Sequence, residues 1–336
     1  LLVGIAGGIG ASIGAILIHQ KLTRLPKNVI LFSWDATEKT VFDELLGAGK
    51  LPFIQSLPYL VKMTDNLEFK AGTVTRPQHA TMFSGYLADV TGIWSNDPTK
   101  NYSPPAENGG LKLATGYSVF ERVRAWFWMN KPYVAGGTGK VGNVGDMLGF
   151  PKQGTYQNMF GFNFFNNGWG LLQDYPPDMY PKRNATEMSL AMAENKPPYF
   201  YMVHFADPDH VGHHYDVNSP QYRDAIVACD RVTGQICQKL STSNPAIIVT
   251  SDHGFGCCVP TSHGGTPNSF LASNLPIVRD AYEVDVTPTI YEYLGIPYEM
   301  FYPKIQGISL MRTAPTRVEV PLIPLSKEQV MFGHEF

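Results

Sequence analysis

Acidic and imidazole side chains gather in three short segments of the sequence and at one later position. Asp35 ends the apolar run 28–35, residues 204–213 read HFADPDHVGH, and residues 251–254 read SDHG. Asp oxygens and His nitrogens together make a ligand set that suits Zn²⁺ or a similar divalent cation. The candidate metal ligands are Asp35, Asp209, His213, Asp252, His253 and His263.

Six candidate ligands are too many for one tetrahedral ion, but they suit two ions with three protein ligands each. Paired divalent ions about 3.5–4 Å apart favour displacement at phosphorus, because one activates a nucleophile while the other stabilises charge on the ester oxygens. Asp207, His210 and His214 are close neighbours in the sequence and stay open as alternative ligands. The chemistry indicated is the cleavage or transfer of a phosphoester.

A hydroxyl nucleophile is expected at Thr75. The segment 73–81 reads TVTRPQHAT, follows a predicted strand and opens a predicted helix with Pro77 near its start. A hydroxyl there faces the positive end of the helix, where free N–H groups favour a bound phosphate. The alternative is that Thr75 only caps the helix. Thr81 and Ser84 are weaker candidates, because they lie further along the helix.

Short apolar runs that predict strands alternate with segments of helical periodicity. This alternation implies an α/β domain with a mostly parallel sheet and helices on both faces. Functional sites in such folds form at the carboxyl ends of the strands, where the three acidic segments begin. The predicted strands are 28–35, 67–73, 131–135, 198–205 and 246–250, and the predicted helices are 38–46, 77–83, 117–127, 220–240 and 287–294.

The motifs, in this order, resemble the alkaline phosphatase superfamily, and most closely its type I phosphodiesterase/nucleotide pyrophosphatase branch. The resemblance runs from about residue 28 to residue 297 and implies an alkaline phosphatase-like three-layer sandwich. It implies two Zn²⁺ ions, and other divalent ions such as Mn²⁺ suit the same ligands. The motifs that carry it are Thr75-Arg-Pro-Gln-His79, Pro208-Asp209-x-x-Gly212-His213 and Ser251-Asp252-His253-Gly254.

The resemblance also distributes the candidate residues between two metal ions. Asp35, Asp252 and His253 would hold one zinc, which also contacts Thr75, whereas Asp209, His213 and His263 would hold the other. It implies a covalent phosphothreonine at Thr75. It assigns Asn96, 21 residues further on, to a phosphate oxygen. We expect Asn96 and the Arg76 backbone N–H to bind the substrate and to stabilise the negative charge that develops on it.

The expected activity is hydrolysis of a phosphodiester of nucleotide or lipid-headgroup type. The Thr-Arg-Pro-x-His form at Thr75 is closer to phosphoethanolamine transferases, so a membrane-linked transferase is one alternative. A phosphomonoesterase or sulfatase-like hydrolase is another, although a formylglycine sulfatase would need Cys or Ser at this position. A non-enzymatic binding module is disfavoured, because all six ligands and the hydroxyl are present.

The 336 residues carry a net charge of -3, which argues against a nucleic-acid polymer as partner. Residues 1–18 contain no charged side chain, so an anchor or signal segment is expected over 1–20, with burial in the core as a third alternative. We expect the catalytic domain over 28–315 and a tail over 316–336. Because the chain begins with Leu1 rather than Met, we also expect further residues upstream.

The expected location is membrane-anchored or secreted, with the catalytic domain outside the cytoplasm. Lys21, Arg24 and Lys27 follow the apolar stretch and favour the opposite orientation, so the orientation stays open. The expected partners are a small-molecule or lipid phosphoester and the membrane, through residues 1–18. The sequence indicates no oligomeric state.

Overall fold

A computed structural model describes residues 27–64, 73–101, 112–127, 134–138, 144, 164–166, 198–256, 260–263 and 268–313. The predicted anchor over 1–20 and the predicted tail over 316–336 lie outside these residues. No helix in the described part of the chain is both long and apolar enough to cross a membrane.

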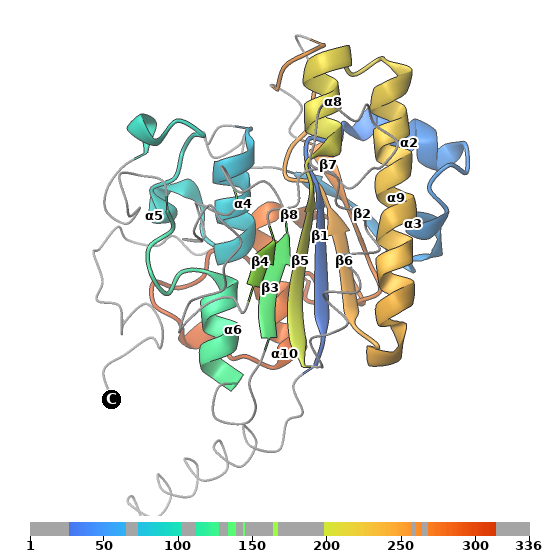
Figure 1. Ribbon diagram of the computed structural model, residues 1–336. Helices are drawn as coiled ribbons and strands as arrows, with labels where there is room; N and C mark the ends of the chain where they lie inside the picture. Colours follow the sequence, from blue (N-terminus) through green and yellow to red (C-terminus); the bar gives the residue numbers. More distant parts are fainter. Residues whose placement is uncertain are drawn as a thin grey trace, which may run out of the picture.

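One eight-stranded sheet forms the centre of the fold, in the order β4-β3-β5-β1-β6-β7-β2-β8 (Figure 1). From β4 to β6 all neighbours pair in parallel, whereas β7 is antiparallel to both β6 and β2. The strands are β1 (Val29–Trp34), β2 (Tyr59–Thr64), β3 (Val134–Thr138), β4 (Phe164–Asn166), β5 (Tyr199–Phe205), β6 (Ala246–Thr250), β7 (Asn268–Ser273) and β8 (Ala281–Tyr282).

Helices cover both faces of the sheet (Figure 1). One face carries α2 (Lys39–Gly47), α3 (Pro52–Ser56), α8 (Asp207–Tyr215) and α9 (Pro220–Leu240). The other carries α4 (Thr75–Ser84), α5 (Ala88–Thr91), α6 (Val119–Phe127) and α10 (Val286–Leu294). Single 3₁₀ turns lie at η2 (Pro98–Lys100), η4 (Ser241–Ser243), η5 (Glu283–Asp285) and η6 (Tyr298–Met300). The three-layer α/β fold class predicted from the sequence is therefore confirmed.

Strand β1 shows why the sheet needs both layers. Its side chains alternate between the two apolar cores, with Leu31 in one and Phe32 and Trp34 in the other, and the whole strand is buried. The Trp34 indole N–H is satisfied by the Thr233 hydroxyl of α9 at 3.1 Å. Burying side chains of this size contributes about 1.5–3 kcal/mol each, which holds the middle of the sheet in one register.

The three central strands place the acidic segments at one edge of the sheet. Parallel pairing aligns Ser33 of β1 with His204 of β5 and with Thr250 of β6. The next residues along each strand therefore emerge together. Asp35 follows β1, α8 follows β5, and Asp252 follows β6. This edge is where ligands bind in open α/β sheets.

Candidate active site

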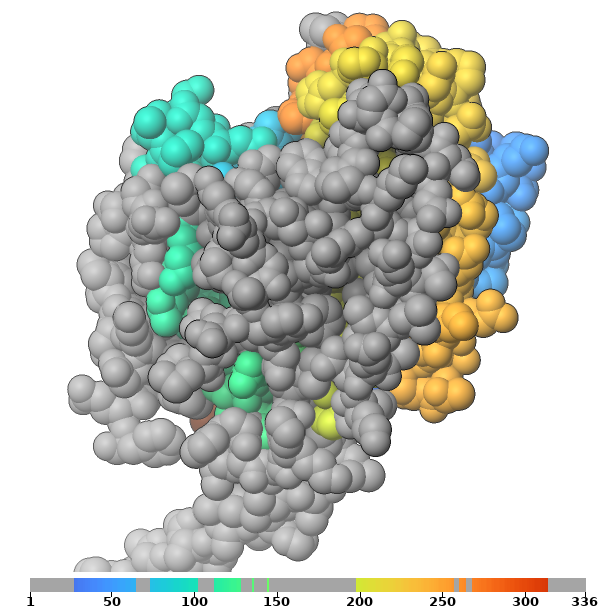
Figure 2. Space-filling model, in the orientation of Figure 1, coloured from blue at the N-terminus to red at the C-terminus, as the bar shows by residue number. Residues whose placement is uncertain are grey.

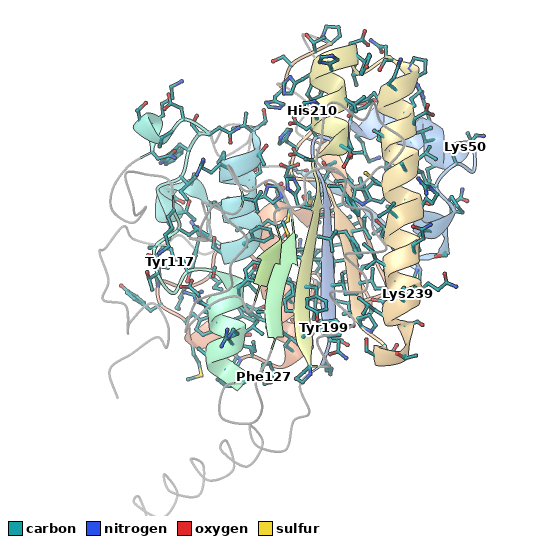
Figure 3. All side chains as sticks on the ribbon, viewed as in Figure 1. Lys50, Tyr117, Phe127, Tyr199, His210 and Lys239 are labelled. Atoms are coloured by element: carbon teal, nitrogen blue, oxygen red, sulfur yellow. The ribbon has the colours of Figure 1, made fainter. Side chains whose placement is uncertain are left out.

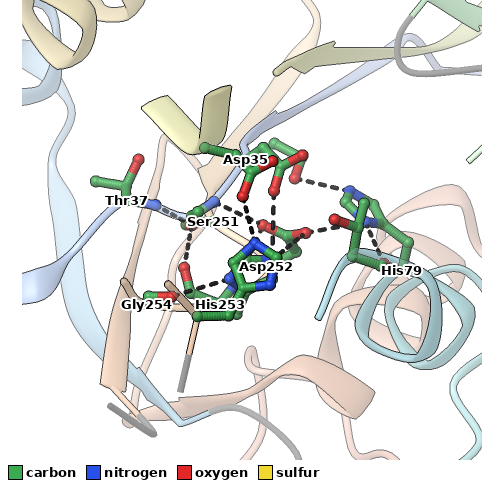
Figure 4. A network of polar contacts seen from close by, with 12 residues as sticks. Asp35, Thr37, His79, Ser251, Asp252, His253 and Gly254 are labelled. Atoms are coloured by element: carbon green, nitrogen blue, oxygen red, sulfur yellow. Dashed lines mark hydrogen bonds and ion pairs between the residues drawn. The ribbon is translucent and has the colours of Figure 1, made fainter. Parts of the chain in front are cut away.

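Asp35, Asp252 and His253 form a fully buried group at this edge. Their ligand atoms lie within 4.8 Å of one another. The His253 Nε2 atom is 3.3 Å from Asp35 Oδ1 and 3.4 Å from Asp252 Oδ2. The three side chains point toward one another from the ends of β1 and β6 (Figure 4). Two buried carboxylates this close need a compensating positive charge.

Backbone hydrogen bonds orient the side chains of Asp252 and His253, so that one metal-ligating atom of each points into the group. Asp252 Oδ1 accepts the N–H groups of Ala36 and His253, both at 3.1 Å, so Oδ2 faces inward. Ala36 lies in the left-handed region, with φ 58°, a strained conformation for alanine that aims its N–H at the carboxylate. His253 Nδ1 donates to the Gly254 carbonyl at 2.9 Å, so Nε2 faces inward as well.

These inward atoms suit a divalent cation. Within the described residues, the polar contacts of the buried Asp252 Oδ2 and His253 Nε2 are long, at 3.2 Å from Oδ2 to His79 Nδ1, 3.3 Å from Nε2 to Asp35 Oδ1 and 3.4 Å between the two atoms. Burial lowers the pKa of His253, but the charges of Asp252 and Asp35 outweigh burial and raise it to about 10. The same two carboxylates that raise this pKa would attract a cation to this point. The donor set of two carboxylates and one imidazole matches zinc-type ligation.

Asp209, His213 and His263 form a second group beside the first. The His263 Nε2 atom lies 2.5 Å from Asp209 Oδ1 and 2.8 Å from His213 Nε2. His213 Nδ1 donates to the Thr261 carbonyl at 2.8 Å, which leaves Nε2 to face the group. The yellow surface of α8 and the orange surface of the segment after β6 adjoin at one end of the molecule (Figure 2).

The two groups meet at His253. Its ring centroid is 4.7 Å from that of His263, and its ligand atom also converges with those of Asp209 and His263. The first group is fully buried, whereas the His213 side chain is 41% exposed. The second group thus forms the side of the site that is nearer to solvent.

Thr75 begins helix α4, and the first group lies beside this N-terminus. The Thr75 backbone carbonyl accepts the His79 Nδ1–H at 2.8 Å, and this Nδ1 also lies 3.2 Å from Asp252 Oδ2. The helix starts two residues before the predicted 77, and its N-cap is Val74, so Thr75 is not the cap residue. Within the described residues, the buried Thr75 Oγ1 has no hydrogen-bond partner.

Asn96 contacts the start of α4 from a later part of the chain. Its Oδ1 accepts the Arg76 backbone N–H at 2.7 Å. This contact turns the amide so that its NH₂ group is the end that can donate to an anion. The structure therefore brings Asn96 and the Arg76 N–H together beside Thr75, as the sequence predicts. The Arg76 N–H donates to Asn96.

The family model for type I phosphodiesterase / nucleotide pyrophosphatase matches residues 29–305. The chain belongs to this family. The chain is similar in fold to human ectonucleotide pyrophosphatase/phosphodiesterase 5, with a TM-score of 0.53 and 15% identity. That similarity covers 80% of this chain and 95% of the human chain.

Curated relatives of this type I phosphodiesterase-family chain include two 2,3-bisphosphoglycerate-independent phosphoglycerate mutases. The one from Antithamnion sp. is 26% identical over 243 residues, which are 66% of this chain and 42% of the mutase. The one from Wolbachia pipientis wMel is 31% identical over 139 residues, 37% of this chain and 27% of the mutase. The chain thus spans less than half the length of either relative.

The sequence analysis assigns no role to two further histidines of the site, His79 and His204. His79 lies four residues after Thr75, and this spacing returns its ring to the Thr75 carbonyl. His204 is a polar residue within the otherwise apolar strand β5 and lies 3.1 Å from Asp35 Oδ2. Burial lowers the pKa of His204, with Asp35 opposing the shift. In the sequence, the signal for a role of His204 was a polar side chain within an otherwise apolar predicted strand.

The alternative ligands Asp207, His210 and His214 also lie on α8. His210 is at the same end of the sheet as the site, whereas Tyr199 and Lys239 mark the opposite end (Figure 3). The His210 ring stacks with the His214 ring at a centroid distance of 6.3 Å. Among the described residues, none of the three converging ligand groups contains Asp207, His210, His214 or His213, but His213 is tied to such a group, with its Nε2 2.8 Å from His263 Nε2 and 3.4 Å from Asp209 Oδ1. The geometry favours Asp209 and His213 of this phosphodiesterase-family chain.

Gly212 of the Pro-Asp-x-x-Gly-His motif gives a test of the second group. A Cβ atom there would lie 2.7 Å from Phe255 Cε1, and the Phe255 ring packs at 4.9 Å against the His213 ring and 5.5 Å against that of His263. We expect Gly212→Ala to displace Phe255 and weaken divalent-cation binding at the second group about tenfold, since loss of ligand support typically costs 10–100-fold.

Metal titration followed by calorimetry measures this effect. Gly47→Ala is the matched control, because a Cβ at Gly47 meets nothing within 4 Å. Equal cation affinities in the two variants would contradict the packing role of Gly212.

Proposed function

We propose that this chain is a two-zinc phosphodiesterase that acts through a covalent phosphothreonine at Thr75. Its family and its alkaline phosphatase-like fold support a metal-dependent phosphoester hydrolase. The observation that carries the finer proposal is the position of the buried Thr75 hydroxyl. It lies at the N-terminus of α4, and His79 links its backbone directly to Asp252 of the first group.

The two groups would hold one cation each, with Asp35, Asp252 and His253 at the first and Asp209, His213 and His263 at the second. When bound, the cations lower the pKa of a hydroxyl or water and stabilise negative charge on phosphate oxygens. Their inward-facing donor atoms are the support for this assignment.

The protein's own groups account for binding and for the covalent step. The Thr75 oxygen loses its proton to solvent and forms a bond to phosphorus, while the bond from phosphorus to the leaving alkoxide breaks and the alkoxide takes up a proton. The N-terminus of α4 and the Asn96 NH₂ group attract the non-bridging oxygens. A water oxygen then attacks the phosphothreonine, which returns the threonine hydroxyl and releases the phosphomonoester.

A transferase is the second candidate. The Thr75-Arg-Pro-x-His79 form favours it, and the curated relatives are mutases. In that reaction a second alcohol replaces water in the attack on the phosphothreonine. The apolar residues 1–18 would suit a lipid substrate at a membrane in either case. The two candidates differ in whether water or an added alcohol receives the phosphoryl group.

A substrate panel tests the proposed activity. We expect the zinc-loaded protein to turn over bis(p-nitrophenyl) phosphate at least about tenfold faster than p-nitrophenyl phosphate or p-nitrophenyl sulfate, a difference of about 1.4 kcal/mol. Release of p-nitrophenol measures each rate. A monoester or sulfate preferred over the diester would overturn the proposal. An added alcohol that captures most of the product would favour the transferase.

A further inference from the structure

His79 and His204 form a buried pair behind the first group of ligands. His79 comes from α4 on one face of the sheet and His204 comes from β5. Both rings are fully buried, and their centroids lie 4.7 Å apart in an edge-on contact. Buried imidazoles stay in a fold when their nitrogens make specific contacts, so the question is what these contacts hold.

His204 holds the orientation of Asp35. Its Nε2 lies 3.1 Å from Asp35 Oδ2, and because an ionised carboxylate only accepts, the imidazole N–H is the donor. The other oxygen, Oδ1, then faces His253 Nε2 at 3.3 Å. Without this donor, the carboxylate plane is free to rotate and no longer holds an oxygen in the position that faces His253.

His79 connects the nucleophile to a ligand and to the central strand. Its Nδ1–H donates to the Thr75 carbonyl at 2.8 Å and lies 3.2 Å from Asp252 Oδ2 (Figure 4). Its Nε2 lies 2.9 Å from the Ser33 hydroxyl of β1. A carbonyl only accepts, so Nδ1 carries the proton and Nε2 accepts from Ser33.

These contacts decide between two uses of the pair. The ligand atoms of His79, His204 and Asp252 converge closely enough to suggest a third cation site. However, both His79 nitrogens and His204 Nε2 already make hydrogen bonds to protein oxygens. Rings that donate to ligand carboxylates fix and orient those ligands, which is the usual task of residues behind a metal site.

We propose that His79 and His204 are positioning residues, which fix Asp35, Asp252 and the start of α4 so that both the ligand oxygens and Thr75 face one point. The proposal rests on the proposed two-zinc function. It assigns a separate task to each ring. His204 sets the affinity of the first cation through Asp35, and His79 sets the placement of Thr75 relative to Asp252.

Paired substitutions test the role of His204. His204→Leu removes the donor, whereas the amide of His204→Gln keeps an N–H near the position of Nε2. We expect His204→Leu to weaken zinc binding 10–100-fold in competition with a chromogenic chelator, and His204→Gln to restore most of it. Thr233→Val is the matched control, because it removes another buried hydrogen bond of strand β1, that of the Trp34 indole, and changes neither a proposed ligand nor a donor to one.

The corresponding pair for His79 is His79→Leu and His79→Asn, whose amide keeps a donor near Nδ1. We expect His79→Leu to lower kcat by more than tenfold with KM little changed, and His79→Asn to recover part of the loss. Ser33→Ala, which leaves the ring but removes its Nε2 partner, should lower kcat less. It serves as the test if the Leu variant does not fold.

Three outcomes would overturn the positioning role. The first is an equal zinc affinity in wild type and His204→Leu. The second is a loss of zinc affinity in His204→Gln as large as that in His204→Leu. The third is a loss of zinc affinity in Thr233→Val as large as that in either His204 variant. Wild-type protein that binds no zinc and cleaves no diester would overturn the proposed function instead. Active wild type with unaffected His79 and Ser33 variants would overturn the role of His79 alone.

Discussion

Replacing Thr75 with alanine is expected to abolish phosphodiester turnover while the protein keeps its bound metal. The substitution removes the hydroxyl at the N-terminus of α4 and leaves every proposed ionic ligand in place. Removal of a nucleophile that forms a covalent intermediate lowers kcat by on the order of 10⁴-fold or more. Release of p-nitrophenol from the diester measures the rate, and elemental analysis measures the zinc.

Two matched variants separate the chemistry from packing. Thr75→Ser keeps a hydroxyl and should retain measurable turnover. Thr81→Ala removes another buried threonine hydroxyl from the same helix, six residues further on, and should leave kcat within a few-fold of wild type. If Thr75→Ala were as active as Thr81→Ala, a direct attack by water would replace the phosphothreonine route.

The central strands were predictable because their sequences are unambiguous. The runs that form β1, β5 and β6 are short and mostly apolar, so the predicted strands match within two residues. Helix α9 was predicted with its observed bounds, since Pro220 stands at its first position and an apolar stripe runs through it. These elements alone bring the segments after β1, β5 and β6 to one edge.

Other elements depend on tertiary contacts that periodicity does not show. β2 and β7 pair antiparallel with each other, but the mixed sequence NSFLAS of β7 has no clear strand signal. Helix α8 is rich in Asp and His and has almost no apolar stripe, so it was not predicted as a helix. The predicted strand 67–73 lies almost wholly outside the described residues.

The site likewise has some residues that the sequence predicts and others whose roles depend on tertiary contacts. Residue type and order were enough to propose Asp35, Asp252 and His253, because each follows a recognisable strand. The four-residue spacing from Thr75 accounts for one contact of His79. The other contacts of His79 and His204 depend on which atoms meet across α4, β5 and β1, and no local pattern specifies them. Gly212 likewise is explained only by Phe255, which occupies the place of a side chain.

Replacing Asp252 with asparagine is expected to remove one of the two cations and nearly all activity. The new Oδ1 can still accept the N–H groups of Ala36 and His253. An NH₂ group then takes the place of Oδ2, and because it offers no lone pair it cannot act as a ligand. Its charge is also lost, so His253 no longer faces two carboxylates.

We expect the bound zinc to fall from two ions to one and kcat to fall at least about 10²–10³-fold, the size seen when one preorganised electrostatic group is removed. Elemental analysis and diester kinetics measure the two effects. Asp230→Asn is the matched control, since Asp230 is equally buried but its carboxylate accepts the Phe53 and Ile54 N–H groups at the start of α3. That variant should lose about 1 kcal/mol of unfolding free energy and keep both cations. Two bound zinc ions in Asp252→Asn would show that the first cation is held by other residues.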